Sequence, residues 1–309
     1  MSLFISIVVC TYNRNQVLCE ALEKLLEQDY PNYELLVIDQ TMEHDAPTTE
    51  YLKSIDCKIR LFKPSFANLP KARNYSLARA RGEVIVFFDD DMDVPLDTLS
   101  KLARNYIDNP QINILTGFMS ENHKIDFVKY SGYAWGKTVR ENSGLMELEV
   151  MDGGFMSFRK SALDRIGGFD EWIGTQMAAS GEDHEMSQRA RMVGYKIYLD
   201  TGITIENKNL GEGGSERAKV DPEFKQIAML NIKFYGVLKN RPYKGLGGWI
   251  AATWAVYRYH ILNRSLVATS PAKLLGKHHQ FIKSHRWARD AIYRNAAETA
   301  QPDVVKFAK

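Results

Sequence analysis

The stretch Val84-Ile85-Val86-Phe87-Phe88-Asp89-Asp90-Asp91 decides the fold, because five apolar residues lead directly into three consecutive aspartates. β-Branched and aromatic residues favour strands, and a short continuous apolar run is typical of a strand that is buried on both faces. Strands of this kind occur mainly in parallel sheets that helices cover on both sides. The stretch therefore predicts a central strand that carries a cluster of carboxylates at its carboxyl end.

Strands and helices alternate on either side of this stretch. Short β-branched runs predict strands at residues 5–10, 35–39 and 59–62, and residues 203–217 are polar and glycine-rich, which predicts a loop. Periodic apolar residues and helix-start signals predict helices over residues 17–26, 96–106 and 182–192, and from Asn68 to a left-handed cap at Gly82. The alternation predicts an α/β fold with a mostly parallel sheet flanked by helices.

Polar residues follow three of these strands. In α/β sheets, ligands bind beyond the carboxyl ends of the strands. The rule places residues 11–13 (Thr11, Tyr12 and Asn13), Asp39 and the three aspartates 89–91 at one rim. We therefore expect the ligand site at this rim.

Composition narrows the classes of function. The chain has 309 residues and a net charge of +2, which argues against a nucleic-acid partner. The charge is uneven, since residues 241–309 hold 12 Lys and Arg against 3 acids (net +9), whereas residues 1–240 hold 28 against 35 (net −7). Three cysteines without a CxxC pair indicate neither a disulfide framework nor a zinc site, so a reducing, cytoplasmic location is expected.

The aspartate cluster is the strongest chemical signal. Crowded carboxylates raise each other's pKa unless a cation lies among them. A hard divalent cation, Mg²⁺ or Mn²⁺, held by one or two carboxylates and by substrate phosphates satisfies that requirement. The alternative is a solvated acidic turn before the next helix, but the preceding strand and the matching rim residues favour the cation site.

Each of two further motifs allows both a functional and a purely structural interpretation. Glu182 and Asp183 begin a helix, where a carboxylate could act as a general base, or Ser180 and Asp183 could form a capping box. Arg73, in Pro70-Lys71-Ala72-Arg73-Asn74, could meet phosphate or orient the carboxylates, or could be an exposed base on a surface helix.

Other single residues carry weaker signals. Tyr12 could stack on a nucleobase or simply pack, and Asp39 could accept a hydrogen bond from a base N–H or be a turn residue. His44 and His123 show no partners in the sequence and are expected at the surface.

The order of these motifs resembles that of family 2 glycosyltransferases of the GT-A fold, over residues 3–215. The resemblance rests on CTYNR (10–14), VIDQT (37–41), PKARNYSLARARGE (70–83), VIVFFDDD (84–91), GGFMSFRKSALDRIGGFDE (153–171) and GEDHEMSQRARMVGY (181–195). It implies an inverting enzyme that takes a hexosyl or deoxyhexosyl group from a UDP-, GDP- or dTDP-sugar to a hydroxyl of a glycan or lipid-linked acceptor, as in polysaccharide biosynthesis.

The resemblance also implies roles for single residues. The nucleotide would contact Thr11, Tyr12, Asn13, Asp39, Arg73, Asp89 and Asp90. A divalent metal would bind Asp91 and Asp89, Asp183 would be the base with Glu182 beside it, and Gly153, Gly154 and Phe155 would line the sugar and acceptor region. Ordering of the glycine-rich loop 209–216 would exclude water.

The chain departs from the family pattern at two positions. Gln40 stands where a second acid commonly follows Asp39, and residues 205–209 lack the histidine that many relatives use as a metal ligand. Glu206 or Asn207 could replace that histidine, or water could complete the metal shell. The departures keep one alternative open, a catalytically weakened nucleotide-sugar-binding protein. The second alternative is a sugar-phosphate nucleotidyltransferase, which shares a nucleotide-binding α/β core. The second would require a glycine-rich loop after the first strand, whereas this loop is CTYNRNQ.

We expect two regions, a catalytic domain over residues 1–220 and a helical, basic and aromatic extension over residues 221–309. Basic and aromatic residues at helical spacing suit a peripheral membrane contact, at the inner face of the membrane. The alternative is a helical cap that packs on the catalytic domain and leaves its bases solvated.

Overall fold

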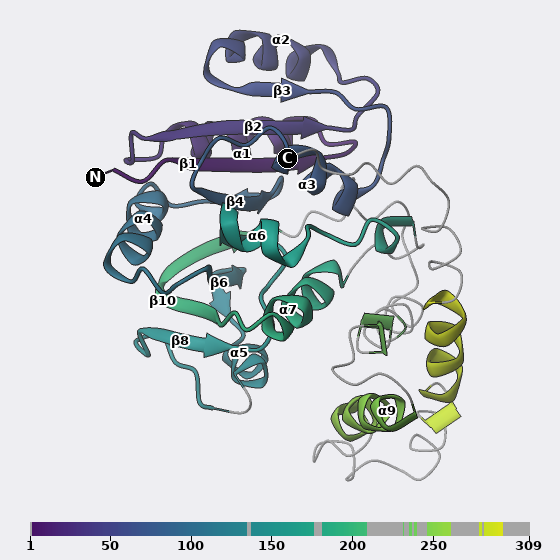
Figure 1. Ribbon diagram of the computed structural model, residues 1–309. Coiled ribbons are helices and arrows are strands. Elements are labelled where there is room, and N and C mark those ends of the chain that lie inside the picture. The colour runs from purple at the N-terminus through teal and green to yellow at the C-terminus, as the bar shows by residue number, and fades with distance from the viewer. Residues whose placement is uncertain are drawn as a thin grey trace. The chain divides into compact units, whose positions relative to one another are not determined.

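The computed structural model describes residues 2–134, 137–175 and 181–208, and in the C-terminal part residues 231, 235–236, 238–239, 246–260, 278–279 and 281–292 (Figure 1). The chain divides into two compact units, residues 1–219 and residues 220–309. We describe each unit by itself. The predicted loop 209–216 and Ser180 lie outside the described residues.

The first unit is built on one mixed sheet with the strand order β3-β2-β1-β4-β9-β6-β10-β5, to which β7 and β8 add on β6 and β10. β1, β2, β3 and β4 are parallel as predicted, and β6 runs parallel to β10. Strands β5, β7, β8 and β9 pair antiparallel. The strands span β1 (Ile5–Thr11), β2 (Tyr33–Asp39), β3 (Arg60–Phe62), β4 (Val84–Asp89), β5 (Met92–Asp93), β6 (Ile114–Glu121), β7 (Lys124–Ile125), β8 (Leu145–Leu148), β9 (Phe155–Arg159) and β10 (Ile197–Asn207).

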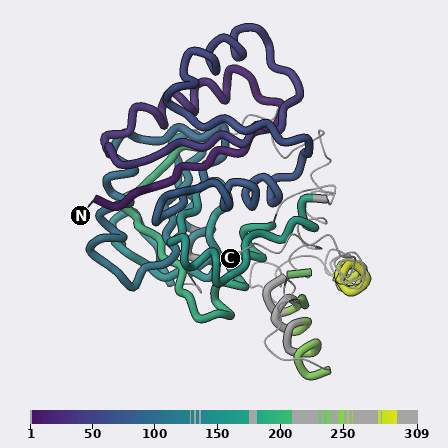
Figure 2. Tube along the Cα trace, turned by 45° about the horizontal axis from the view of Figure 1, so that its top comes forward, coloured from purple at the N-terminus to yellow at the C-terminus, as the bar shows by residue number. Residues whose placement is uncertain are grey.

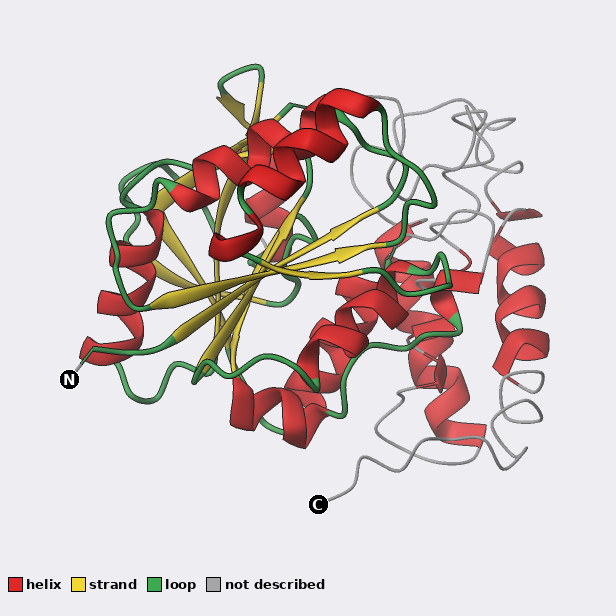
Figure 3. Ribbon diagram, turned by 90° about the horizontal axis from the view of Figure 1, so that it is seen from above, coloured by secondary structure: helices red, strands yellow, loops and turns green. Residues whose placement is uncertain are grey.

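Helices cover both faces of the sheet, as Figure 3 shows. Side chains of α1 (Gln16–Leu26), α2 (Ala46–Ser54) and α4 (Thr98–Asp108) pack into the core on one face. Side chains of α3 (Leu69–Leu77), α5 (Phe127–Tyr133), α6 (Lys160–Ile166) and α7 (Glu182–Met192) pack into the core on the other. Short 3₁₀ turns lie at η1 (Asp56–Lys58) and η2 (Ile173–Thr175). The predicted α/β class is confirmed.

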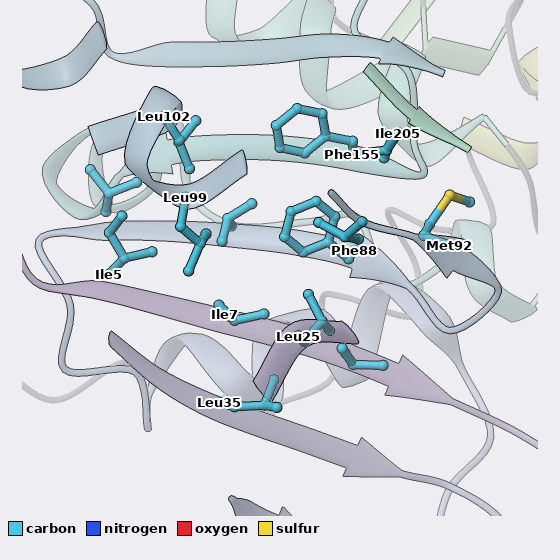
Figure 4. Close-up of a cluster of buried hydrophobic side chains, with 14 of the residues drawn as sticks. Ile5, Ile7, Leu25, Leu35, Phe88, Met92, Leu99, Leu102, Phe155 and Ile205 are labelled. Atoms are coloured by element: carbon cyan, nitrogen blue, oxygen red, sulfur yellow. The ribbon is translucent and has the colours of Figure 1, made fainter. Parts of the chain in front are cut away.

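Strand β4 is buried on both faces, as the opening stretch predicts. Val84, Val86 and Phe88 enter the core beneath α1 and α4, whereas Ile85 and Phe87 enter the opposite core. Figure 4 shows the first core, where the Phe88 and Phe155 rings stack with centroids 5.0 Å apart. Apolar burial on two faces fixes the register of the strand, because a slip by one residue would exchange the two sets of side chains.

Two sequence expectations about chain geometry are wrong. Helix α3 ends at Leu77, and Gly82 is not left-handed. Glycine is required at position 82 for space, since a Cβ there would lie 2.4 Å from the backbone nitrogen of Ser6. Residues 203–207, expected in a loop, form the end of β10, whose buried residues alternate with less buried ones along most of the strand.

The described residues of the second unit are helical. Helix α9 spans Leu246–His260, and residues 281–292 form another helix. The two helices pack together through Trp249 and Thr253 on His285 and through Tyr257 on Phe281. Among the helices that the structure describes, none combines the length and apolar character that crossing a membrane requires.

Candidate active site

The carboxyl ends of three parallel strands meet at one rim. Thr11 at the end of β1 pairs in register with Asp39 at the end of β2, and Cys10 pairs with Asp89 at the end of β4. Figures 1 and 2 show β1 and β2 running side by side toward this rim. The prediction that these strand ends share one rim is confirmed, because parallel strands in register end at the same edge.

The three aspartates engage different partners. The hydroxyl of Thr11 donates a 2.6 Å hydrogen bond to Asp90 Oδ2, and Arg14 Nε lies 3.7 Å from Asp90 Oδ1. Arg14 Nη2 donates to Asp91 Oδ2 at 3.3 Å, and Arg73 Nη2 donates to Asp89 Oδ1 at 3.2 Å. Arg14 was not predicted as a site residue, although it follows the rim residues 11–13 directly.

Crowding and burial perturb these carboxyl groups. Burial raises the pKa of Asp89 to about 8; Arg73 opposes this shift and the neighbouring aspartates add to it. The Asp89 side chain is still 38% exposed, so water moderates the effect. Burial likewise raises the pKa of Asp90 to about 6, against the Thr11 hydrogen bond and the charge of Arg14. Bound cations would favour the ionised forms of both groups.

Arg73 connects the rim to helix α7. Its side chain is 2% exposed, and its guanidinium donates to Glu182 Oε1 at 2.8 Å, to Asp89 Oδ1 and to the carbonyl of Gly153 at 3.1 Å. The same group lies 5.3 Å from the centre of the Phe169 ring. Of the three alternatives, the structure supports the orientation of carboxylates, and an exposed position for Arg73 is wrong.

The acid pair lies at the first turn of α7, which begins at Glu182 as predicted. Glu182 Oε2 is buried and has no hydrogen-bond partner among the described residues. Burial raises the pKa of Glu182, and the charge of Asp183 adds to this shift, against the pull of Arg73. The N-cap residue is Gly181, in a left-handed conformation with φ 104°, and no side chain among the described residues caps the helix.

Asp183 is held ionised by its neighbour. Its Oδ1 accepts a hydrogen bond from the backbone N–H of His184 at 2.7 Å and lies 3.1 Å from His184 Nδ1. Burial alone would raise the pKa of Asp183, but the charge and hydrogen bonds of His184 bring it down to about 2. A Cβ on Gly153 would lie 3.3 Å from Asp183 Oδ2, so glycine at 153 leaves space beside this oxygen.

Asp39 is fully buried and surrounded by donors. It accepts from the backbone N–H of Thr41 at 2.9 Å, and its Oδ2 lies 2.8 Å from His44 Nε2 and 3.3 Å from Lys63 Nζ. The expectation that His44 lies at the surface is therefore wrong; its side chain is 2% exposed. His44 and Lys63 also line a cavity of about 370 Å³.

Gln40 has a structural use at the position where the family pattern has an acid. Its side-chain Nε2 donates to the carbonyl of Thr11 at 3.4 Å, and its Oε1 accepts from the N–H of Asn68 at 2.6 Å. The neutral amide thus connects β1 to the start of α3. A carboxylate at position 40 could accept from Asn68 but could not donate.

The remaining predicted site residues divide between rim and core. Asn13 is exposed with φ 53°, and Tyr12 is half-buried beside it. Gly154 packs against Met92 and Met119, where a Cβ would lie 2.4 Å from the Met119 sulfur. The Phe155 side chain belongs to the core, where it is fully buried and not exposed to a sugar, rather than to the rim.

Oxygen donors at the rim fit a hard divalent cation, although the described residues contain no group of three or more Cys, His, Asp or Glu side chains placed to hold a metal. Four carboxyl groups, those of Asp89, Asp90, Asp91 and Glu182, share the guanidinium groups of Arg14 and Arg73. When all four are ionised, the excess of two negative charges matches a divalent cation. Such a cation would take its further ligands from phosphate or water.

The segment that could replace the missing histidine runs close to the cluster. Glu206 and Asn207 pair with Asp93 and Met92 of β5, and the N–H of Lys208 donates to the carbonyl of Asp91 at 3.0 Å. The Glu206 carboxylate, however, accepts from the Ser120 hydroxyl and from the N–H of His123. His123 itself is exposed, as expected.

The mixed sheet with an acidic rim is the GT-A fold of nucleotide-sugar transferases. The structure superposes on the TarS 1–349 fragment of Staphylococcus aureus in complex with UDP-GlcNAc with a TM-score of 0.60 and 18% identity, covering 96% of this chain and 91% of the fragment. The mannosyltransferase PcManGT of Pyrobaculum calidifontis, solved with GDP-Man and Mn²⁺, gives a TM-score of 0.58 and 18% identity over 98% of this chain and 88% of that one.

The chain belongs to glycosyl transferase family 2, whose sequence profile matches residues 6–167, just over half of the chain. It is 23% identical to the poly-β-1,6-N-acetyl-D-glucosamine synthase of Staphylococcus epidermidis over 69% of this chain and 55% of the synthase. It is 30% identical to the S. aureus poly(ribitol-phosphate) β-N-acetylglucosaminyltransferase TarS over 36% of this chain and 20% of TarS. The chain thus spans about half of the first relative and a fifth of the second.

Proposed function

We propose that this glycosyltransferase inverts the anomeric centre of a nucleotide sugar as it transfers the sugar to a hydroxyl group of a glycan or a lipid-linked acceptor. The observation that carries the proposal is the Arg73 network. One buried guanidinium bonds Asp89 at the donor rim, Glu182 beside the candidate base, and the Gly153 carbonyl. Asp183 lies next to the same glycine, so the candidate base and the arginine that bonds the donor rim both contact Gly153.

The donor side of the proposal uses the strand ends. Thr11, Tyr12, Asn13 and Asp39 would contact the nucleoside, while Asp89 and Asp90 would contact the ribose. A divalent cation held by Asp91 and Asp89 would supply positive charge to the leaving diphosphate. The structure of PcManGT was solved with GDP-Man and Mn²⁺, which supports a nucleotide diphosphate and a cation here.

The acceptor side uses Asp183. Its ionised carboxylate would take the proton of the acceptor hydroxyl while the oxygen attacks the anomeric carbon. The bond from that carbon to the diphosphate breaks, and the electron pair leaves with the diphosphate. Attack from the face opposite the leaving group gives inversion in one displacement. The names of the first two relatives specify β-linkages, the product of inverting an α-linked donor.

Asp183→Asn tests this function. The variant should lose turnover by at least about 100-fold, the lower range for general-base catalysis, while it retains the affinity for the nucleotide diphosphate. Asp164→Asn, an exposed carboxylate on α6, is the matched control and should leave both unchanged. Wild-type protein that binds donors but transfers nothing to any acceptor would instead indicate a weakened nucleotide-sugar-binding protein.

Two binding measurements define the donor. Melting temperatures with UDP-, GDP- and dTDP-sugars in the presence of Mn²⁺ rank the nucleotides, because a ligand that binds the native state raises the melting temperature. Calorimetry of the preferred nucleotide diphosphate with and without Mn²⁺ then tests the cation. Equal affinity in the two titrations would contradict metal-dependent donor binding.

We also propose that the C-terminal unit contacts an anionic membrane surface. Helix α9 exposes Leu246, Ile250 and Trp254 by 77%, 61% and 57%, and their spacing of four residues puts them on one helix face. The helix over residues 281–292, which packs on α9, exposes Lys283 and Arg286. An apolar stripe with neighbouring cations, in a region of net charge +9, is complementary to a lipid interface with acidic headgroups.

Vesicle co-sedimentation tests the membrane contact. The wild-type chain should pellet with phosphatidylglycerol vesicles and less with phosphatidylcholine vesicles, and Ile250→Ser with Trp254→Ser should lower the pelleted fraction several-fold. Met42→Ser, which removes an exposed apolar side chain of the first unit, is the control. A double variant that melts lower but pellets like the wild type would show that the stripe packs against protein instead.

A further inference from the structure

The loop between β1 and α1 holds Arg14 in a fixed place. Asn13 and Asn15, on either side of it, are both bonded by the loop after β2: the Asn13 N–H donates to Thr41 Oγ1 at 2.8 Å, and Asn15 Oδ1 lies 3.0 Å from His44 Nδ1. Asn13 has φ 53°, a conformation that asparagine adopts more readily than most residues. The turn therefore aims Arg14 at the acidic cluster before any ligand is bound.

Arg14 lies between two carboxylates. Its side chain is 7% exposed, with Nη2 3.3 Å from Asp91 Oδ2 and Nε 3.7 Å from Asp90 Oδ1. Both aspartates are largely buried, so water screens their repulsion poorly. Without a cation at this position, two neighbouring negative charges would face each other in a poorly solvated site.

We propose that Arg14 is the internal counter-ion of the aspartate cluster and that it competes with the divalent cation for Asp91. The inference rests on the cation site of the proposed function. In it, Arg14, which is not one of the metal ligands, sets the affinity of that site for the cation. Arg14 stabilises the metal-free arrangement of Asp90 and Asp91. A divalent cation must share Asp91 with the guanidinium or displace it, so Arg14 weakens metal binding in the absence of the donor and acts as a positioning residue.

Arg14→Gln separates this role from a purely structural one. The variant should melt several degrees lower than the wild type without metal, because it removes the guanidinium charge that lies between two largely buried carboxylates. Mn²⁺ alone should raise its melting temperature by more than that of the wild type. Calorimetry with Mn²⁺ and no nucleotide should give a dissociation constant at least about tenfold lower for the variant, since removing a competing charge favours the cation.

Three controls complete the test. Arg104→Gln, an exposed arginine on α4, should behave like the wild type, and Arg14→Lys, which keeps the charge, should retain the wild-type affinity for Mn²⁺ even if Arg14→Gln folds poorly. Adding Asp91→Asn to Arg14→Gln should abolish the gain. Weaker or equal Mn²⁺ binding by Arg14→Gln, or no binding by either protein, overturns the inference. Because these measurements use neither donor nor acceptor, they stand apart from the turnover test of Asp183.

Discussion

Replacement of Arg73 by methionine is the sharpest test of the site architecture. Methionine fills much of the same volume but removes the charge that Glu182 and Asp89 share. Removing one partner of a buried ion pair costs about 3–5 kcal/mol, because the other charge stays buried. Glu182 is buried, so its unpaired charge accounts for most of the cost. The Asp89 side chain is 38% exposed, and solvent screens its charge. We therefore expect the free energy of unfolding to fall by about 3 kcal/mol, the lower end of that range.

Thermal unfolding followed by circular dichroism measures this loss. Domains of 150–250 residues lose about 2–4 °C for each kcal/mol, so the melting temperature should fall by roughly 6–12 °C. Arg81→Met, an exposed arginine shortly after the same helix, should change stability by less than about 0.5 kcal/mol. In a Glu182→Gln background the effect of Arg73→Met should shrink by at least about 1 kcal/mol. An effect below 1 kcal/mol, or one of equal size in both backgrounds, would refute the network.

Three more predictions follow from single contacts. Gly82→Ala should destabilise the fold by about 1–3 kcal/mol in urea denaturation, because its Cβ would lie 2.4 Å from a backbone nitrogen; a loss below 0.5 kcal/mol would contradict the close approach. His44→Ala should weaken nucleotide diphosphate binding about tenfold by calorimetry, since it releases Asp39, and unchanged affinity would remove Asp39 from the nucleotide site. The pKa of Asp183 is about 2, below its ordinary 3.8, so its ionised form contributes stability above about pH 4 that is lost as the pH falls toward 2. The difference in melting temperature between wild type and Asp183→Asn should therefore narrow as the pH falls from about 4 toward 2; a difference at pH 3 equal to that at pH 5 would argue against the lowered pKa.

The rim could be predicted from sequence because its signals are local. The strands that lead to Thr11, Asp39 and Asp89 are short apolar runs, and a parallel sheet brings their ends to one edge. The start of α7 at Glu182 followed in the same way from local polarity and periodicity. Strand β10 was not predicted at all, and its end at residues 203–207 was expected in a loop because polar residues lie between Ile203 and Ile205, although these two continue the two-residue alternation of the strand.

Long-range partners could not be predicted. His44 is buried because it bonds Asp39 and Asn15, and the pairing of those residues depends on the β1–β2 register rather than on anything near His44 in the sequence. One feature of the sequence could have identified Arg14 as a site residue, namely its position directly after the rim residues 11–13. The side chain of Phe155 turns into the core because Phe88 lies opposite it across the β4–β9 pairing. Its glycine-rich neighbourhood gave no hint of that direction.

Gly153 is where the two halves of the proposed reaction meet. Its carbonyl accepts from Arg73, which also holds Asp89 at the donor rim, and its missing side chain leaves space at Asp183 Oδ2. A Cβ at this position would approach that oxygen to 3.3 Å, and larger side chains would cover the carboxylate that an acceptor hydroxyl must reach. Glycine at this position therefore has two structural effects: its carbonyl accepts from the arginine that pairs with the acids, and its lack of a side chain leaves the proposed base accessible. In the proposed reaction the same residue would link the order of the donor rim to the approach of the acceptor, although the acid pair and the aspartate cluster are about ninety residues apart in sequence.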